Sequence, residues 1–250
     1  MIEVEGLEKR FGKVRALKGV SFTARPGEVY GLLGPNGAGK TTALRILATL
    51  LKADRGRARV NGLDVVRDSE RVRRSIGVVN GGMGLYDRLT GREILHYFGR
   101  LYGMSRARIE ERIGELDGLL NLGETLPRRA GGFSTGMKQK IVVARAVLHD
   151  PPVIFFDEAT SGLDVMARRA VLDFVRDYPG RERTVIYSTH VMSEVEELCD
   201  RAAIVFEGEK IAEGSVQELL ATGRADHLEQ AFFGIVERYR AAGDVAEVAA

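Results

Sequence analysis

Short runs of apolar residues alternate with helical patterns over much of the 250-residue chain. Such runs are typical of strands buried on both faces of a parallel sheet. The runs are residues 28–33, 153–156, 185–188 and 202–206. After the first run, leucines recur at helical spacing, at positions 44, 47, 50 and 51. Because strands and helices alternate, the pattern predicts an α/β core with a mostly parallel sheet.

The middle of the chain, from about Thr90 to Leu148, lacks strand signals. Thr90 and Glu93 have the spacing of a helix-capping box. Four apolar residues at helical spacing follow: Ile109, Ile113, Leu116 and Leu120. The pattern predicts a helical subdomain at about residues 82–150, inserted in the α/β core. Apolar positions from Asp226 onward predict a helical C-terminal tail over residues 226–250.

Composition narrows the class of protein. The formal net charge is only +2, so bulk charge gives no reason to expect a nucleic-acid partner. The single cysteine, Cys199, excludes an internal disulfide, and its apolar surroundings predict a buried side chain. No apolar run approaches the ~18 residues that a spanning helix needs. We therefore expect a soluble chain whose membrane role, if it has one, depends on another polypeptide.

One glycine-rich segment fits the phosphate-binding pattern G-x-x-x-x-G-K-[ST] between an expected strand and an expected helix. Glycines allow several backbone N–H groups to converge on phosphate oxygens, and the helix adds its positive dipole end. Lys40 would bridge the β- and γ-phosphates, and the Thr41 hydroxyl would bind Mg²⁺. The expected binding residues are Gly34, Pro35, Asn36, Gly37, Ala38, Gly39, Lys40, Thr41 and Thr42.

A second acidic motif ends the apolar run VIFFDE, residues 153–158. Asp157 would lie at the carboxyl edge of the sheet, where ligands bind in α/β folds, and would hold Mg²⁺ directly or through water. Glu158 would accept a proton from the attacking water, and Lys40 and His190 complete the expected catalytic set. Together with the phosphate loop, the motif predicts hydrolysis of a nucleoside triphosphate.

The order of the remaining motifs resembles the ATP-binding subunits of ATP-binding-cassette (ABC) transporters over about residues 1–220. These motifs are FSTGMKQK (133–140), SGLD (161–164) and YSTH, which ends at His190. The resemblance implies a P-loop NTPase core with an antiparallel β subdomain near the N-terminus. It also implies an ATPase domain over residues 1–225, with the helical subdomain inserted, and ATP with Mg²⁺ as ligands.

By the same resemblance, Ser134, Thr135, Gly136 and Met137 form the signature segment, which binds the γ-phosphate of ATP held by the opposite subunit. Asp164 lies in the segment that crosses the dimer interface. His190 contacts the γ-phosphate and orients Glu158 and water, and Phe11 stacks on adenine. Taken alone, the signature segment could be an ordinary helix cap, Phe11 a core aromatic and His190 an incidental residue after a strand. The assignment therefore depends on the order of the motifs.

The resemblance also implies partners. Two subunits pack head-to-tail when ATP binds, as a homodimer or as a heterodimer with a second ATPase subunit. An integral membrane permease binds this pair on the cytoplasmic, inner face of the membrane. The motifs look most like sodium-extruding exporters, within a branch that also handles drugs and lipids. Two alternatives remain: a soluble regulatory or translation- or repair-type ATPase, and a binding-only module with weak hydrolysis.

Three positions depart from the family pattern. Gly81 stands where a metal- and water-contacting Gln is usual, Thr135 replaces a Gly, and Ala159 replaces a Pro. Gly81 offers only backbone atoms, so we expect coupling to the permease to depart from the usual scheme. An apolar stripe at residues 97, 98, 101 and 102 belongs either to the core of the helical subdomain or to a groove for a permease helix.

Overall fold

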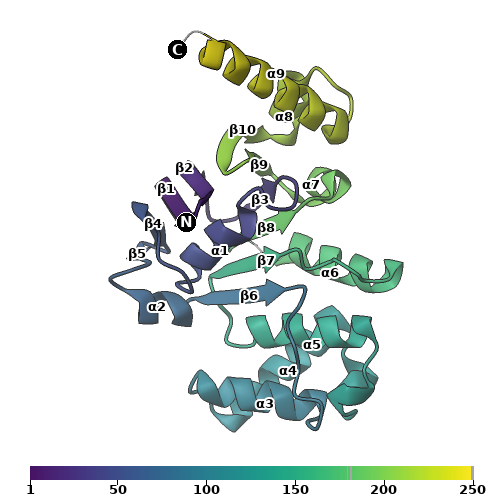
Figure 1. Cartoon of the computed structure of the whole chain (residues 1–250). Helices are drawn as coiled ribbons and strands as arrows, with labels where there is room; N and C mark the ends of the chain where they lie inside the picture. Colours follow the sequence, from purple (N-terminus) through teal and green to yellow (C-terminus); the bar gives the residue numbers. More distant parts are fainter. Residues whose placement is uncertain (179, 181, 249–250) are drawn as a thin grey trace.

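The computed structural model describes residues 1–178, 180 and 182–248. Its main sheet has six strands in the order β10-β9-β3-β8-β7-β6, all parallel except β10, which pairs antiparallel with β9. The strands are β3 (Val29–Leu33), β6 (Ile76–Asn80), β7 (Val153–Asp157), β8 (Thr184–Thr189), β9 (Arg201–Phe206) and β10 (Glu209–Ser215). The predicted α/β fold with a mostly parallel sheet is confirmed (Figure 1).

A smaller antiparallel sheet, formed by residues near the N-terminus, lies beside the main sheet. Its order is β2-β1-β4-β5, and its strands are β1 (Ile2–Phe11), β2 (Val14–Ala24), β4 (Arg55–Val60) and β5 (Leu63–Asp64). Helix α1 (Lys40–Leu47) packs between the two sheets in one apolar cluster that includes Leu7, Leu32 and Leu47 (Figure 1). This packing fixes the start of α1, where the phosphate loop ends.

Helices fill the segment between β6 and β7. They are α3 (Gly91–Leu101), α4 (Arg106–Leu120) and α5 (Thr135–Val147), with short 3-10 turns at Gly123–Thr125 and Ala130–Gly132. The predicted capping box is present, because Thr90 and Glu93 bond each other's backbone and side chain at the start of α3. The predicted apolar face of α4 is buried. The bounds 82–150 for this subdomain stay a prediction.

The remaining helices pack around the two sheets. They are α2 (Ser69–Arg74), α6 (Val165–Asp177), α7 (Met192–Leu198), α8 (Val216–Gly223) and α9 (Leu228–Val248). Helix α2 contacts β5 and β6, α7 contacts β3 and β8, and α8 and α9 contact β10. The expected C-terminal helix begins at Leu228, and the last two residues of the predicted tail, 249 and 250, lie outside the described residues. Over the described ranges, no helix combines the length and apolar content that a membrane span requires.

One helical prediction is wrong in extent. The leucine pattern predicted that the helix after the phosphate loop would reach Leu51, but α1 ends at Leu47. Thr49 has a positive φ of 63°, which turns the chain out of the helix. Leu50 is therefore 69% exposed instead of facing the core.

Candidate nucleotide-binding and hydrolysis site

The phosphate loop leads from β3 directly into α1. Gly37 and Gly39 have φ values of 81° and 110°, a region that glycine reaches without a steric penalty. A Cβ at Gly39 would also lie 2.5 Å from the carbonyl oxygen of Ala16. Glycine at position 39 is therefore needed both for the turn and for its close approach to β2.

Lys40 is buried at the start of α1, where its side chain is only 3% exposed. Its Nζ donates hydrogen bonds to the carbonyl oxygens of Gly34 (2.7 Å) and Pro35 (3.0 Å) and lies 3.4 Å from Glu158 Oε1. Burial lowers the pKa of Lys40, and the nearby carboxylates of Glu158 and Asp157 oppose that shift. The ammonium group is thus held in the concave face of the loop, facing the acidic end of β7.

Asp157 is the last residue of β7, and its carboxylate is buried between two hydroxyl groups. Thr41 Oγ1 donates to Asp157 Oδ1 at 3.0 Å, and Ser188 Oγ donates to the same oxygen at 3.1 Å. Mg²⁺ prefers oxygen ligands and commonly combines one or two carboxylates with phosphate oxygens. The pairing of Thr41 and Asp157 fits such an ion.

Glu158 follows Asp157 with an unusual backbone conformation. Its φ is 49°, a left-handed value that is uncommon for non-glycine residues and that clusters at functional sites. Its N–H donates to the Ser188 carbonyl oxygen at 3.0 Å, and its Oε1 lies 3.5 Å from His190 Nδ1. Lys40 and His190 therefore approach the same carboxylate oxygen from two different elements.

Gly81 lies directly beside this turn. Its N–H donates to the Asp157 carbonyl oxygen at 3.2 Å, and a Cβ at this position would be 2.6 Å from the Glu158 carbonyl oxygen. The neighbouring amide of Asn80 is used locally, because its Oδ1 accepts from the Gly82 N–H at 3.0 Å. Backbone atoms of Gly81 thus occupy the space next to Glu158.

A cavity of about 260 Å³ opens over the phosphate loop. It is lined by Ala16, Asn36, Gly37, Ala38, Gly39, Lys40, Thr41, Thr42 and Glu158. Phe11 is absent from this lining. It is 48% exposed near the tip of the β1–β2 hairpin, with Lys9 Nζ 5.7 Å from its ring centre.

The predicted signature residues form a separate group. Ser134 caps α5 by accepting from the Met137 N–H at 3.3 Å, and Thr135 is exposed beside it. A Cβ at buried Gly136 would lie 2.9 Å from Ala167 Cβ, so the start of α5 packs closely against α6. Asp164 caps α6 through the Ala167 N–H at 2.9 Å. Within the described residues, neither helix start contributes to the lining of the phosphate-loop cavity.

Three contributors were missed by sequence reasoning. Ala16 lines the cavity, and Ser188 bonds Asp157. Glu194, on α7, bonds the segments that follow Glu158 and that precede His190. Ser188 lies two residues before His190 in the YSTH motif, so its position could have indicated that it lies near the site. Ala16 and Glu194 carry no local motif.

The fold and this site define a phosphate-loop nucleoside triphosphatase. Residues 17–161 match the profile of a family described as ABC transporter. The chain is 42% identical over 243 residues to the ABC transporter ATP-binding protein NatA of Bacillus subtilis (strain 168), which covers 95% of this chain and 99% of the relative. It is also 42% identical over 219 residues to the Nod factor export ATP-binding protein I of Rhizobium sp. (strain N33), covering 88% and 72% respectively. The chain belongs to the ABC transporter family.

Solved structures agree with this assignment. The ATP-binding subunit of an ABC transporter superposes with a TM-score of 0.86 at 29% identity, over 94% of this chain and 99% of that one. A dimeric ATP-binding cassette in a post-hydrolysis state, bound to ADP and Pi, superposes with a TM-score of 0.77 at 25% identity, over 86% and 99%. This chain is accordingly an ATP-binding, ATP-hydrolysing ABC subunit.

Proposed function

We propose that Lys40, Thr41, Asp157, Glu158 and His190 form the ATP hydrolysis site of this subunit. The observation that carries the proposal is that Lys40 Nζ and His190 Nδ1 lie 3.4 and 3.5 Å from one carboxylate oxygen, Glu158 Oε1. A lysine that binds phosphate and a carboxylate that can orient water and accept its proton are groups suited to phosphoryl transfer to water, and the imidazole is placed to orient that carboxylate.

In this proposal each side chain has one task. The loop N–H groups and Lys40 bind the phosphate chain, and Glu158 accepts the proton of the attacking water. His190 holds the Glu158 carboxylate in place and contacts the terminal phosphate. Thr41 and Asp157 would hold Mg²⁺, which when bound offsets phosphate charge. The cavity of about 260 Å³ over the loop leaves room for the phosphate chain, and Phe11 would stack on adenine.

The signature residues complete the site from a second subunit. Ser134, Thr135, Gly136 and Met137 lie at the start of α5, apart from the phosphate loop of their own chain, and Asp164 lies beside them. Val165 and Met166, which follow Asp164, are 82% and 79% exposed, as expected of apolar residues that another protein covers. We therefore propose a head-to-tail dimer, of two identical subunits or with a second ATPase subunit, which forms when Mg²⁺-ATP binds.

The substitution Glu158→Gln tests both parts of the proposal. Removing the general base should lower the rate of phosphate release by about 100- to 10,000-fold while ATP still binds. Light scattering should then detect a dimer with Mg²⁺-ATP and a monomer without it. Full turnover in Glu158→Gln would contradict the assigned base. A monomer under both conditions would contradict the head-to-tail dimer of the isolated subunit.

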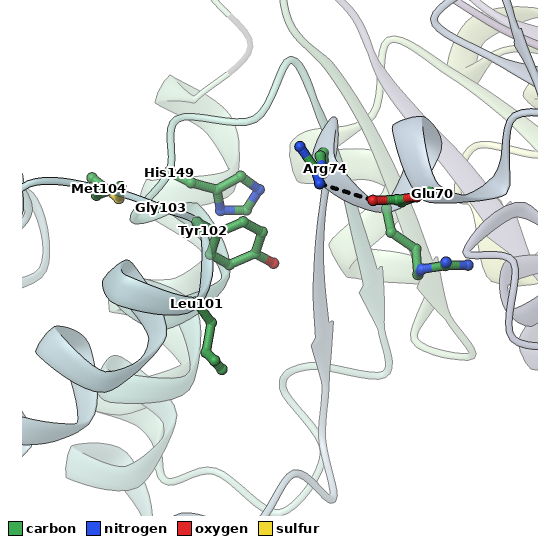
Figure 2. Close-up of a pocket in the computed structure, with 8 residues that line it drawn as sticks. Glu70, Arg74, Leu101, Tyr102, Gly103, Met104 and His149 are labelled. Atoms are coloured by element: carbon green, nitrogen blue, oxygen red, sulfur yellow. Dashed lines mark hydrogen bonds and ion pairs between the residues drawn. The ribbon is translucent and has the colours of Figure 1, made fainter.

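A permease is the proposed membrane partner, and a groove beside the helical segment is its proposed docking site. Two adjoining pockets, of about 550 and 380 Å³, share Arg73 and Tyr102. Figure 2 shows Leu101 and Tyr102 at the end of α3 on one side of the larger pocket, with Glu70 and Arg74 of α2 on the other. Leu101 is 65% exposed and Tyr102 is 40% exposed, so this end of the stripe is suited to a partner helix, whereas Phe98 packs against the main apolar cluster.

Cross-linking tests this docking site. A cysteine at position 101 should cross-link to a co-expressed permease, whereas a cysteine at Leu119 of α4, which is 62% exposed, should not. Cross-links from position 119 alone would exclude the groove. Export is proposed because one relative is named for Nod factor export. The cargo would be sodium, a drug or a lipid, the classes that the motif resemblance implies. The subunit would act at the inner, cytoplasmic face of the membrane.

A further inference from the structure

Glu194, in the first turn of α7, is a buried carboxylate that the hydrolysis scheme above does not use. It is 1% exposed. Its Oε1 accepts from Thr160 Oγ1 at 2.7 Å and lies 3.0 Å from Arg168 Nε. Its Oε2 accepts from Thr189 Oγ1 at 2.7 Å and from Tyr187 OH at 3.0 Å. An ionised carboxylate only accepts hydrogen bonds, and these donors occupy both of its oxygens.

The donors come from the segments that carry the proposed catalytic groups. Thr189 directly precedes His190, and its Oγ1 also accepts from the Val191 N–H at 3.0 Å, so its contacts flank the histidine on both sides. Thr160 lies two residues after Glu158. Arg168 is on α6, one turn after Asp164, whose carbonyl oxygen accepts from the Arg168 N–H at 2.9 Å. One carboxylate therefore joins three separate segments.

The signature helix connects to the same network. Gln139 of α5 is buried, and its Nε2 donates to the Ala159 carbonyl oxygen at 2.7 Å. Ala159 lies between Glu158 and Thr160. One hydrogen bond therefore joins α5 to the turn that carries Glu158 and, through Thr160, to the carboxylate of Glu194.

The buried Glu194 carboxylate opposes movement of the three segments relative to one another. Removing a carboxylate from water is costly unless its lone pairs are satisfied, and a donor that moves away leaves that cost uncompensated. The three segments consequently hold one relative geometry as long as Glu194 keeps its donors. Small displacements of catalytic groups lower rates strongly, even when the altered residue does not touch the substrate.

We propose that Glu194 is a positioning residue for ATP hydrolysis, which fixes His190 relative to Glu158 and to the Asp164 segment. The proposal rests on the catalytic roles assigned above to Glu158 and His190. It concerns turnover and leaves the phosphate loop, which binds ATP, unaffected.

The test compares Glu194→Gln with Tyr178→Phe in the full chain. Tyr178 also donates a buried hydrogen bond, to the Pro151 carbonyl oxygen at 2.8 Å, but it lies at the opposite end of β7. Glu194→Gln should lower kcat about 10- to 100-fold, the effect of misplaced catalytic groups, with KM and the Kd for ATP within about twofold. Tyr178→Phe should leave kcat unchanged.

Single hydroxyl deletions keep the test informative if Glu194→Gln fails to fold. Thr189→Val and Thr160→Val each remove one donor at nearly constant volume, and each should lower kcat without weakening ATP binding. The losses from Thr189→Val and Glu194→Gln should not add in the double variant, because they act through one network.

Three outcomes would overturn the proposal: an unchanged kcat in these variants, a loss of kcat matched by an equal loss of ATP affinity, or fully additive losses. His190→Ala separates this inference from the proposed site. If that variant turns over normally, the catalytic assignment itself is wrong. If it is inactive while the Glu194 variants are normal, only the positioning role fails.

Discussion

At the residue scale, Gly81 limits the backbone geometry of Glu158, which lies beside it in space. It lacks the side chain that the resemblance led us to expect, and its backbone lies against Glu158. A side chain at this position would require the Glu158 turn, which already has a φ of 49°, to move. The Gly81 position therefore constrains the proposed base sterically.

Gly81→Ala should lower kcat about tenfold and destabilise the fold by about 1–3 kcal/mol, the usual cost of overpacking. Its Cβ would lie 2.6 Å from the Glu158 carbonyl oxygen, closer than packed atoms can approach. Gly84→Ala is the matched control, because a Cβ there meets nothing within 4 Å. Phosphate release and thermal unfolding measure the two effects. Equal kcat values for the two variants would contradict the steric argument.

Cys199 gives a second prediction at the same scale. Burial raises the pKa of its thiol well above the usual range, so little reactive thiolate is present at neutral pH. A maleimide should leave native protein unmodified at pH 7 and label it only after unfolding, as measured by mass spectrometry. A cysteine at exposed Ser193 of α7, the helix that Cys199 directly follows, is the control and should react within the native state. Rapid labelling of native Cys199 would show that α7 opens readily.

At the scale of elements, α3 and α4 cross at a glycine. A Cβ at buried Gly99 of α3 would lie 2.6 Å from Ile109 Cγ1 of α4. Gly99→Ala should therefore destabilise the protein by about 1–3 kcal/mol. Gly114→Ala, at an exposed position of α4 with nothing within 4 Å, should instead stabilise it by about 0.5–1 kcal/mol through helix propensity. Denaturant unfolding of both variants measures the change in the free energy of unfolding, which should have opposite signs. The same sign in both variants would contradict the close contact between α3 and α4 at Gly99.

Local sequence was sufficient to predict a structural feature wherever the residues that determine it are adjacent in the chain. The phosphate loop, the strand that ends at Asp157 just before Glu158, and the capping box at Thr90 all follow from residues adjacent in the chain. Leu50 was misplaced because the turn at Thr49 overrides the leucine spacing. Glu194 was missed because its donors come from positions up to 34 residues away. Contacts of that kind depend on the tertiary fold and leave no local pattern.

The C-terminal helix is part of the core at the scale of the whole molecule. Its buried residues join the main apolar cluster with residues of α7, α8 and β9; they are Leu228, Ala231, Phe232, Ile235 and Val236. Ending the chain at residue 227 would expose the partners of these side chains. At about 1.5–3 kcal/mol for each large apolar side chain, the loss in stability should be on the order of 5 kcal/mol.

The measurement for this truncation is thermal unfolding of the 1–227 chain, with the full 250-residue chain as the reference. The shorter chain should unfold at a clearly lower temperature or aggregate. An unchanged melting temperature for 1–227 would mean that α9 contributes little to the stability of the main core.

The position of β3 in the sheet has a consequence for biosynthesis. This strand delivers the phosphate loop, yet both of its neighbours, β8 and β9, come from residues 184–189 and 201–206. At ribosomal rates of about 5–20 residues per second, roughly 10–35 s separate the synthesis of β3 from that of β9. During that interval a strand that is entirely buried in the finished fold has no permanent neighbours. We therefore expect transient pairing or a chaperone to shield it until the last third of the protein emerges.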